Sequence, residues 1–160
     1  METRLGRLVR RPDGRPEMAS GGRHVSIAHD GALVLAVSAA DAPGCDLQAC
    51  EPRSADDWSR LLGGERMQLA LFLESHGDPL NVAATRVWCA AECLAKAGLS
   101  RDTRLAHGGA LDGWLTLSAD GALILTRAFR VRDASNPLMV AALLNGARAA
   151  KLQAVSRAAV

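Results

Sequence analysis

The sequence lacks several features that mark whole classes of protein, and each absence narrows what the chain can do. No apolar run among the 160 residues approaches the roughly 20 that a membrane-spanning helix needs. Residues 1–11 contain four arginines and no apolar core of a signal peptide, which predicts a cytoplasmic protein. The formal net charge of only +2 gives no indication of a general nucleic-acid binder.

Motifs for zinc, nucleophilic or nucleotide chemistry are also missing. The four cysteines form two pairs, Cys45 with Cys50 and Cys89 with Cys93, and neither pair has the C-x-x-C spacing of a zinc ribbon. We therefore expect small buried thiols. No G-x-S-x-G elbow is present, and no glycine pair is followed by Gly-Lys-Ser/Thr, so neither a serine hydrolase nor a P-loop is indicated.

The hydrophobic content and the length of the chain predict one folded domain over residues 1–160. Hydrophobic residues make up 49% of the chain, which is enough to bury a core at this length. Helical periodicity predicts two helices within 54–73, separated at Gly63-Gly64, and a third at 81–98. Apolar runs bounded by turn residues predict strands at 24–29, 32–38, 45–48, 113–118, 122–131 and 137–144.

Capping residues predict where these elements end. Ser54 is expected to cap the start of the first helix, Asn81 to cap the start of the third helix, and Gly98 to cap its end. The basic segment 1–22 is expected to be loop-rich, and the alanine-rich residues 147–160 to be a short helix or a frayed tail. The predicted class is α+β, with hairpins flanking a central block of helices.

The helix at 81–98 carries the most suggestive chemistry. Trp88, Glu92 and Lys96 follow in steps of four, which places them on one stripe of the helix. A carboxylate can hold a hard divalent cation, and an ammonium one turn later can meet a phosphate or move a proton. With Asp46 as a second acid at the end of an apolar strand, the pattern indicates magnesium-dependent chemistry on a phosphate ester.

Each of these residues also has an ordinary structural interpretation. Glu92 and Lys96 can form a solvated ion pair worth a few tenths of a kcal/mol. Trp88 can be a core residue, Asp46 a turn residue, and His29 the end of a hairpin strand. The order of short motifs along the chain favours the chemical interpretation.

Four such motifs occur in an order that resembles the surfactin-type 4′-phosphopantetheinyl transferases. In that family they read G-[KR]-P, S-x-S-H on a strand, G-[IV]-D-x-E on a strand, and W-x-x-K-E-[AS]-x-x-K on a helix. The corresponding segments here are Gly14-Arg15-Pro16, Val25-Ser26-Ile27-Ala28-His29, Gly44-Cys45-Asp46-Leu47-Gln48 and Trp88 to Gly98. Residues 83–88 and 112–114 are similar to the C-terminal transferase domain of enediyne-type iterative polyketide synthases.

The resemblance implies a 4′-phosphopantetheinyl transferase-like fold, with an antiparallel sheet packed against helices in a complete or partial two-lobe arrangement. It implies magnesium-dependent transfer of phosphopantetheine from coenzyme A to a serine of an acyl carrier protein or of a polyketide synthase carrier domain. Adenosine 3′,5′-bisphosphate would be the second product. The front lobe looks shortened, which implies a segment of a larger synthase or an assembly of several copies, such as a trimer.

The resemblance also assigns site residues. The residues expected to hold magnesium are Asp46, Glu92 and Gln48. The residues expected to be catalytic are Glu92, Lys96 and Asp46. Contacts to the phosphates of coenzyme A are expected from His29, Arg15 and Lys96. The general base is left open between Glu92, Lys96 and a metal-bound water.

Two departures from the family leave room for another function. Gln48 replaces the second acid of the strand motif, and Ala91 replaces the lysine before the helical glutamate, so the site carries less charge. The alternative is a catalytically degenerate domain that docks a carrier protein or acts as a scaffold, and a third option is a small nucleotide-binding protein. Glu65 is either a third acid near the metal or an ordinary helix-start carboxylate.

Overall fold

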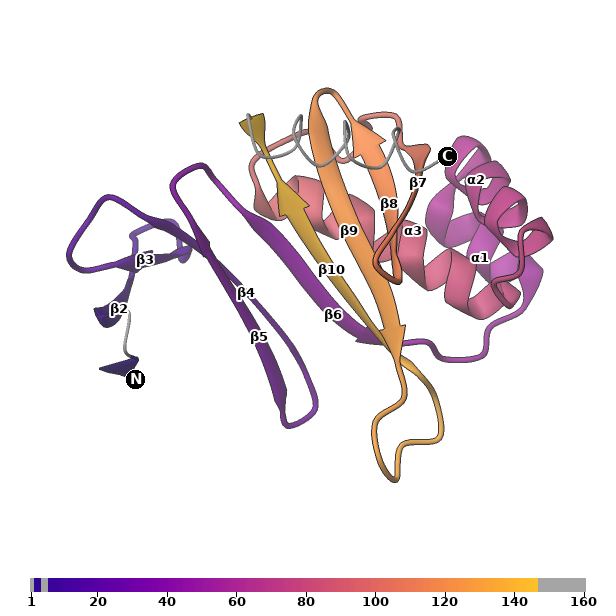
Figure 1. The fold of residues 1–160 in the computed structure, drawn as a ribbon, viewed down its shortest axis with the longest axis horizontal. Coiled ribbons are helices and arrows are strands. Elements are labelled where there is room, and N and C mark those ends of the chain that lie inside the picture. Colours follow the sequence, from indigo (N-terminus) through magenta and orange to yellow (C-terminus); the bar gives the residue numbers. More distant parts are fainter. Residues whose placement is uncertain (1, 4–5, 147–160) are drawn as a thin grey trace.

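The structure is a computed structural model that describes residues 2–3 and 6–146. Within these residues the chain forms two antiparallel five-stranded sheets and three helices, which confirms the predicted α+β class (Figure 1). The first sheet has the strand order β1-β2-β3-β4-β5, and the second has the order β6-β10-β9-β8-β7. The first sheet and the helices lie on opposite sides of the second sheet (Figure 1).

The elements of the first sheet are β1 Glu2–Thr3, β2 Gly6–Arg10, β3 Pro16–Met18, β4 His24–Asp30 and β5 Leu33–Ala39. Those of the second sheet are β6 Gly44–Ala49, β7 Ala106–Leu111, β8 Trp114–Ala119, β9 Ala122–Phe129 and β10 Leu138–Leu144. The helices are α1 Ala55–Leu62, α2 Gly64–Ser75 and α3 Leu80–Lys96. All six predicted strands and all three predicted helices are therefore present, with bounds shifted by a few residues.

Helix α3 lies at the centre of the core. Ten of its 17 residues are buried, and it packs against α2 and against β6, β9 and β10. Its alanine and cysteine side chains are small enough for this close packing. A Cβ atom on Gly44 would lie 1.9 Å from the carbonyl oxygen of Cys93, so β6 and α3 meet at a point where only glycine fits. Asp46 lies two residues further along β6 and so points to the same side, toward α3.

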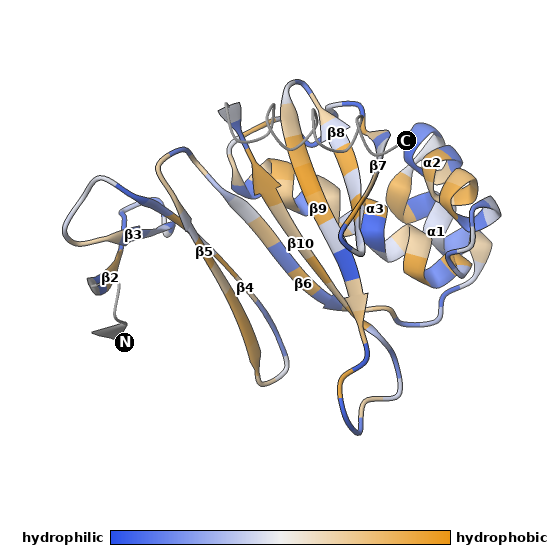
Figure 2. Cartoon of the chain, viewed as in Figure 1, coloured by the Kyte–Doolittle hydropathy of each residue, from blue (hydrophilic) through white to orange (hydrophobic). Residues whose placement is uncertain are grey.

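Apolar residues are concentrated along β9 and β10, two inner strands of the second sheet (Figure 2). A second, smaller apolar layer joins the two sheets on the side away from α3. Its members are Ala28, Leu35, Val37, Cys45, Leu47, Leu138 and Val140. Because this layer includes side chains of β4, β5, β6 and β10, it holds the first sheet against one edge of the second.

Side chains of β4 bind the outer edge of β6. The Ser26 hydroxyl accepts a hydrogen bond from the backbone N–H of Cys45 at 3.0 Å. The Asp30 carboxylate accepts one from the backbone N–H of Ala49 at 2.5 Å. These bonds satisfy backbone donors that an edge strand leaves unpaired, and they place the end of β4 beside Asp46 and Gln48.

The end of α3 follows the prediction. Gly98 has φ of +83°, its N–H donates to the carbonyl of Ala95 at 3.0 Å, and the N–H of Leu99 donates to the carbonyl of Leu94 at 2.9 Å. This pair of bonds is a Schellman motif, which requires a left-handed residue after the C-cap. Lys96 is thereby fixed in the last helical turn, where a cation interacts favourably with the helix dipole.

The prediction for the start of α3 was wrong. The helix begins at Leu80, directly after Pro79, and Asn81 makes no cap. The side-chain oxygen of Asn81 instead accepts hydrogen bonds from the indole N–H of Trp58 at 2.8 Å and from the backbone N–H of Arg53 at 3.0 Å. Asn81 thus links α3 to α1 and to the segment that precedes α1.

The loop-rich prediction for residues 1–22 was wrong in part, because β1, β2 and β3 lie there. Only three residue pairs join β2 to β3, and arginine and proline obscure the alternation on which a sequence prediction depends. Strand β7 was also missed, since it contains Gly108-Gly109 and an irregularity in its pairing with β8. The expectation for residues 147–160 falls outside the described residues.

No helix in the described ranges combines the length and the apolar character that crossing a bilayer requires.

Candidate functional site

An open cavity of about 550 Å³ lies where the end of β4, strand β6, helix α3 and the loop after α3 meet. It gathers residues that are far apart in the sequence. Among those that line it are His29, Asp46, Gln48, Trp88, Glu92 and Arg101. Four of the residues assigned by the motif resemblance are therefore brought together, namely His29, Asp46, Gln48 and Glu92.

Lys96 lies next to Asp46. Its ammonium donates to the carboxylate of Asp46 at 2.7 Å and to the backbone carbonyl of Cys45 at 2.9 Å. The Lys96 side chain is 32% exposed and that of Asp46 is 11% exposed, so the pair is partly shielded from water. The ammonium therefore holds the carboxylate in place and remains within reach of an anion in solution.

Glu92 has a different partner. Its carboxylate accepts a hydrogen bond from the guanidinium of Arg101 at 3.0 Å. Glu92 and Lys96, although one turn apart, do not pair with each other among the ion pairs of the described residues. The Arg101 side chain is 58% exposed, so this ion pair is worth at most about 1 kcal/mol and can be exchanged for another ligand.

The cavity has more negative than positive lining charge. Four carboxylates line it, and one guanidinium does. The carboxylates belong to Asp30, Asp46, Glu51 and Glu92. Asp30 is already bound to the backbone of Ala49. A free pyrophosphate would meet net repulsion here, whereas a divalent cation would be attracted.

The donor set suits magnesium rather than zinc. Asp46 and Glu92 offer carboxylate oxygens and Gln48 an amide oxygen, which are the hard ligands that magnesium prefers. In the part of the chain that is described, no three His, Cys, Asp or Glu side chains form a closed metal cage. Magnesium is commonly held by one or two carboxylates together with water and substrate phosphates, so two acids are sufficient.

Two residues weighed in the sequence lie elsewhere. Arg15 is exposed in the turn between β2 and β3 and does not line the cavity. Its guanidinium lies near Gly98, just beyond the end of α3. Glu65 lines a separate cavity beside α2, so the idea that it is a third acid at the same metal was wrong. The motif spacing cannot tell which face of a loop or helix a side chain occupies.

The four cysteines are buried and free, as expected. Burial raises the pKa of the Cys89 and Cys93 thiols well above the ordinary value, and the nearby carboxylate of Asp46 adds to the effect. Burial also raises the pKa of Cys45 and Cys50. Because the thiolate is the reactive and metal-binding form, these residues are packing groups of α3, of β6 and of the residue after β6 near neutral pH.

Sequence reasoning missed Arg101 and Asp30 as parts of this site. Arg101 lies nine residues beyond Glu92, outside the helix motif, and becomes a neighbour only because the Schellman turn reverses the chain. Asp30 is the last residue of β4, and its side chain bonds to β6. A basic residue shortly after the end of a helix that carries an acid near its last turn is the signal available for Arg101.

Comparisons with known proteins add no family assignment: no protein-family model matches the chain, and no curated protein matches it.

Proposed function

We propose that the chain transfers the 4′-phosphopantetheine group of coenzyme A to a serine hydroxyl of an acyl carrier protein, with magnesium. The observation that supports this most is the convergence of His29, Asp46, Gln48 and Glu92 on one cavity, with Lys96 bound to Asp46. These residues follow from the sequence alone, over a span of 68 positions. Asp46 and Gln48 share one strand, and Glu92 and Lys96 share one helix, so the convergence that the fold adds is that of β6, α3 and His29.

The cavity's charge supports the role of a metal. Magnesium bound by Asp46 and Glu92 would neutralise the pyrophosphate of coenzyme A and so stabilise charge in the transition state. Gln48 would hold a water of the metal's hydration shell through its amide oxygen. Without the metal, four carboxylates would oppose the approach of the substrate.

Glu92 is the proton acceptor that we assign to the reaction. The serine oxygen attacks the phosphorus attached to pantetheine, and the bond from that phosphorus to the bridging oxygen of the adenosine bisphosphate breaks. The hydroxyl proton passes to Glu92, and the bisphosphate leaves with the electron pair of the broken bond. Lys96 is less suited to accept a proton, because its ammonium already donates to two oxygens.

In this scheme Lys96 and His29 bind the phosphates of coenzyme A. The Lys96 ammonium would shift part of its hydrogen bonding from Asp46 to a phosphate oxygen as the metal takes over the carboxylate. His29, at the exposed end of β4, would meet the nucleotide phosphates. Arg15 has no place in the cavity, so we do not assign it a role in binding.

The two differences from the family motifs, at Ala91 and at Gln48, affect the cavity to different degrees. Ala91 is only 4% exposed and does not line the cavity, so the missing lysine there removes no charge from the lining. Gln48 does line it and leaves one charge fewer at the metal. The small first sheet agrees with a shortened front lobe, which a carrier domain, a neighbouring domain or a second copy would complete.

A scaffold that docks a carrier protein is the second candidate. It is favoured by one observation: both acids of the proposed metal site already hold a basic side chain, Lys96 on Asp46 and Arg101 on Glu92. A domain that never binds metal would keep such pairs permanently. In a transferase, the exposed pair at Arg101 would open when metal and coenzyme A bind.

Intact-mass spectrometry separates the two candidates. The chain is incubated with magnesium, coenzyme A and apo carrier domains of polyketide synthases. We expect one carrier domain to gain the mass of one phosphopantetheine group, and the gain to disappear when a chelator removes magnesium. If no carrier domain gains this mass while a known transferase modifies the same domains, the scaffold function replaces the enzymatic one.

A further inference from the structure

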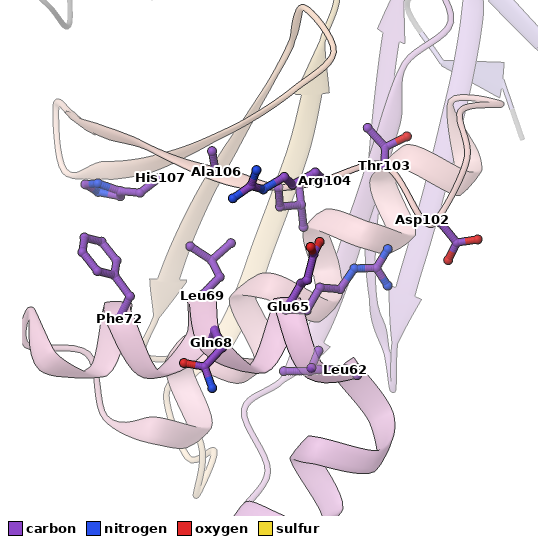
Figure 3. A pocket seen from close by; sticks show the side chains of 14 residues that line it. Leu62, Glu65, Gln68, Leu69, Phe72, Asp102, Thr103, Arg104, Ala106 and His107 are labelled. Carbon is purple, nitrogen blue, oxygen red and sulfur yellow. The ribbon is translucent and has the colours of Figure 1, made fainter.

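A second cavity, of about 640 Å³, lies between α2 and the segment 102–107 that follows α3 (Figure 3). It is larger than the candidate active site and shares no lining residue with it. Its volume lies within the range of roughly 300–1,000 Å³ that is typical of small-molecule sites. Nothing in the proposed transfer reaction uses it.

One end of this cavity is apolar and aromatic. Leu69 and Phe72 project from α2 into the space, and the ring of Phe72 faces that of His107, with 5.5 Å between the centroids (Figure 3). The ring of His76 also contacts Phe72, with a centroid distance of 4.1 Å and a tilt of 35° between the rings. Phe72 is 42% exposed, so a large apolar ring remains in contact with water unless a ligand covers it.

Two opposite charges adjoin the apolar end. The guanidinium of Arg104 extends over Leu69, and the carboxylate of Glu65 rises from the first turn of α2 toward the same space (Figure 3). Neither side chain makes a hydrogen bond or an ion pair within the part of the chain that the structure describes. Asp102, in contrast, points away from the other labelled side chains (Figure 3).

We propose that this cavity binds a small amphipathic zwitterion, of which an apolar α-amino acid is the simplest form. The carboxylate of the ligand would bind Arg104, its ammonium would bind Glu65, and its side chain would cover Leu69 and Phe72. This ligand class pairs the charges of Arg104 and Glu65 and covers the apolar surface at once, while Arg66 and Asp102 also line the cavity. An anion would leave Glu65 unpaired, and a cation would leave Arg104 unpaired.

The environment of His107 agrees with this ligand. Burial, together with the nearby His76, lowers the pKa of His107, so its ring is mainly uncharged at neutral pH. An uncharged imidazole adds to the apolar end and does not repel an ammonium group. Glu65 lies in the first turn of α2.

The test measures binding of L-phenylalanine to the full chain by calorimetry and by ligand-observed NMR. Two analogues each lack one charge: 3-phenylpropanoate has no ammonium, and phenethylamine has no carboxylate. We expect L-phenylalanine to bind, and each analogue to bind about tenfold more weakly, as for the loss of one charge-assisted contact. No detectable binding of either L-phenylalanine or L-leucine would overturn the proposal.

Two variants assign the charges. Arg104→Gln should weaken binding of L-phenylalanine and 3-phenylpropanoate and leave that of phenethylamine unchanged. Glu65→Gln should weaken binding of L-phenylalanine and phenethylamine and leave that of 3-phenylpropanoate unchanged. Matched controls are Arg132→Gln and Glu74→Gln, which replace exposed residues outside the cavity. If both test variants bind all three compounds as the parent chain does, the ligand lies elsewhere and the proposal is wrong.

The proposal does not depend on the transferase function. Circular dichroism and the melting temperature show whether each variant folds, and both test residues are exposed, so we expect no loss of structure. Failure of phosphopantetheine transfer leaves the amino-acid titration unaffected. Failure of the titration in turn leaves the carrier-domain assay unaffected.

Discussion

The two cavities of this molecule differ in how their charges are arranged. In the candidate active site, Asp46 is paired with Lys96 and Glu92 with Arg101, so a ligand must exchange with contacts that already exist. In the cavity beside α2, Arg104 and Glu65 have no such partner in the described residues, and an apolar ring lies next to them. Paired charges suit a site that opens for metal and phosphate, whereas unpaired charges suit direct binding of a ligand.

The positions of the two cavities differ as well. The first lies between β6 and α3, and most of its lining residues belong to β4, β6 and α3. The second lies between a helix and a surface loop. Substitutions in the first are expected to affect chemistry strongly, and stability only where they disturb the contact between β6 and α3. Substitutions near the second are expected to affect ligand binding with little effect on the fold.

The largest expected effect is that of Glu92→Gln on transfer. Loss of the proton acceptor and of one metal ligand should slow the modification of a carrier domain by roughly a hundredfold or more. Because the Glu92–Arg101 pair is partly exposed, the melting temperature should change little. The rate is followed by intact mass, with Glu74→Gln on α2 as control. An unchanged rate would remove Glu92 from the mechanism.

A large effect on stability is expected from Gly44→Ala. The added methyl group would overlap the carbonyl of Cys93, so β6 and α3 must separate, at about 1–3 kcal/mol. The free energy of unfolding in urea measures this. The control is Gly64→Ala at the start of α2, where a Cβ atom meets nothing within 4 Å. Equal stability of the two variants would contradict the close contact.

A smaller effect is expected from Arg101→Gln, which should change the affinities for metal and for coenzyme A in opposite directions. Removing the guanidinium frees Glu92, so Mn²⁺ alone, as a substitute for magnesium, should bind about two- to fivefold more tightly. Coenzyme A with the metal should bind more weakly, because Arg101 is then missing as a partner for a phosphate. Calorimetry measures both, and Arg132→Gln is the control. A change of the same sign in both titrations would indicate a merely structural role.

The smallest expected effect concerns His107 beside the second cavity. Its pKa is lowered in the folded chain, so the folded state takes up a proton less readily than the unfolded chain does. Stability is therefore unaffected by His107 above its ordinary pKa of 6.5, and it falls as the pH drops through that value toward the lowered one. His107→Gln should reduce this fall, as measured by urea midpoints at about pH 7.5 and about pH 5.5. A steeper fall in the variant would contradict the direction.

Much of the fold was predictable, because long apolar runs and strong turn residues dominate the second sheet and the helices. The hairpin at Asp30-Gly31 and the glycine end of α3 both follow from local backbone preferences. Strands β1, β2, β3 and β7 were not predicted, since they are short, basic or glycine-containing, and pairing with neighbours holds them. The role of Asn81 depends on Trp58, which is 23 residues away in sequence.

The candidate site was predictable only as a set of residue types. The spacing of Trp88, Glu92 and Lys96 placed them on one stripe, but it could not show that Lys96 pairs with Asp46 instead of Glu92. That choice depends on the close approach of β6 and α3 at Gly44. Arg101 and the second cavity depend on where a loop lies in space, and a sequence pattern does not contain that information.

Calorimetric titration of coenzyme A tests the central proposal most directly. The carboxylates of the cavity would repel the pyrophosphate of coenzyme A unless magnesium neutralises them, so binding should require the metal. The titration is made in magnesium and repeated with a chelator in place of the metal. We expect binding in magnesium, and loss of most of the affinity without it. Equal affinity in both conditions, or no binding in either, would contradict a magnesium-dependent coenzyme A site at Asp46 and Glu92.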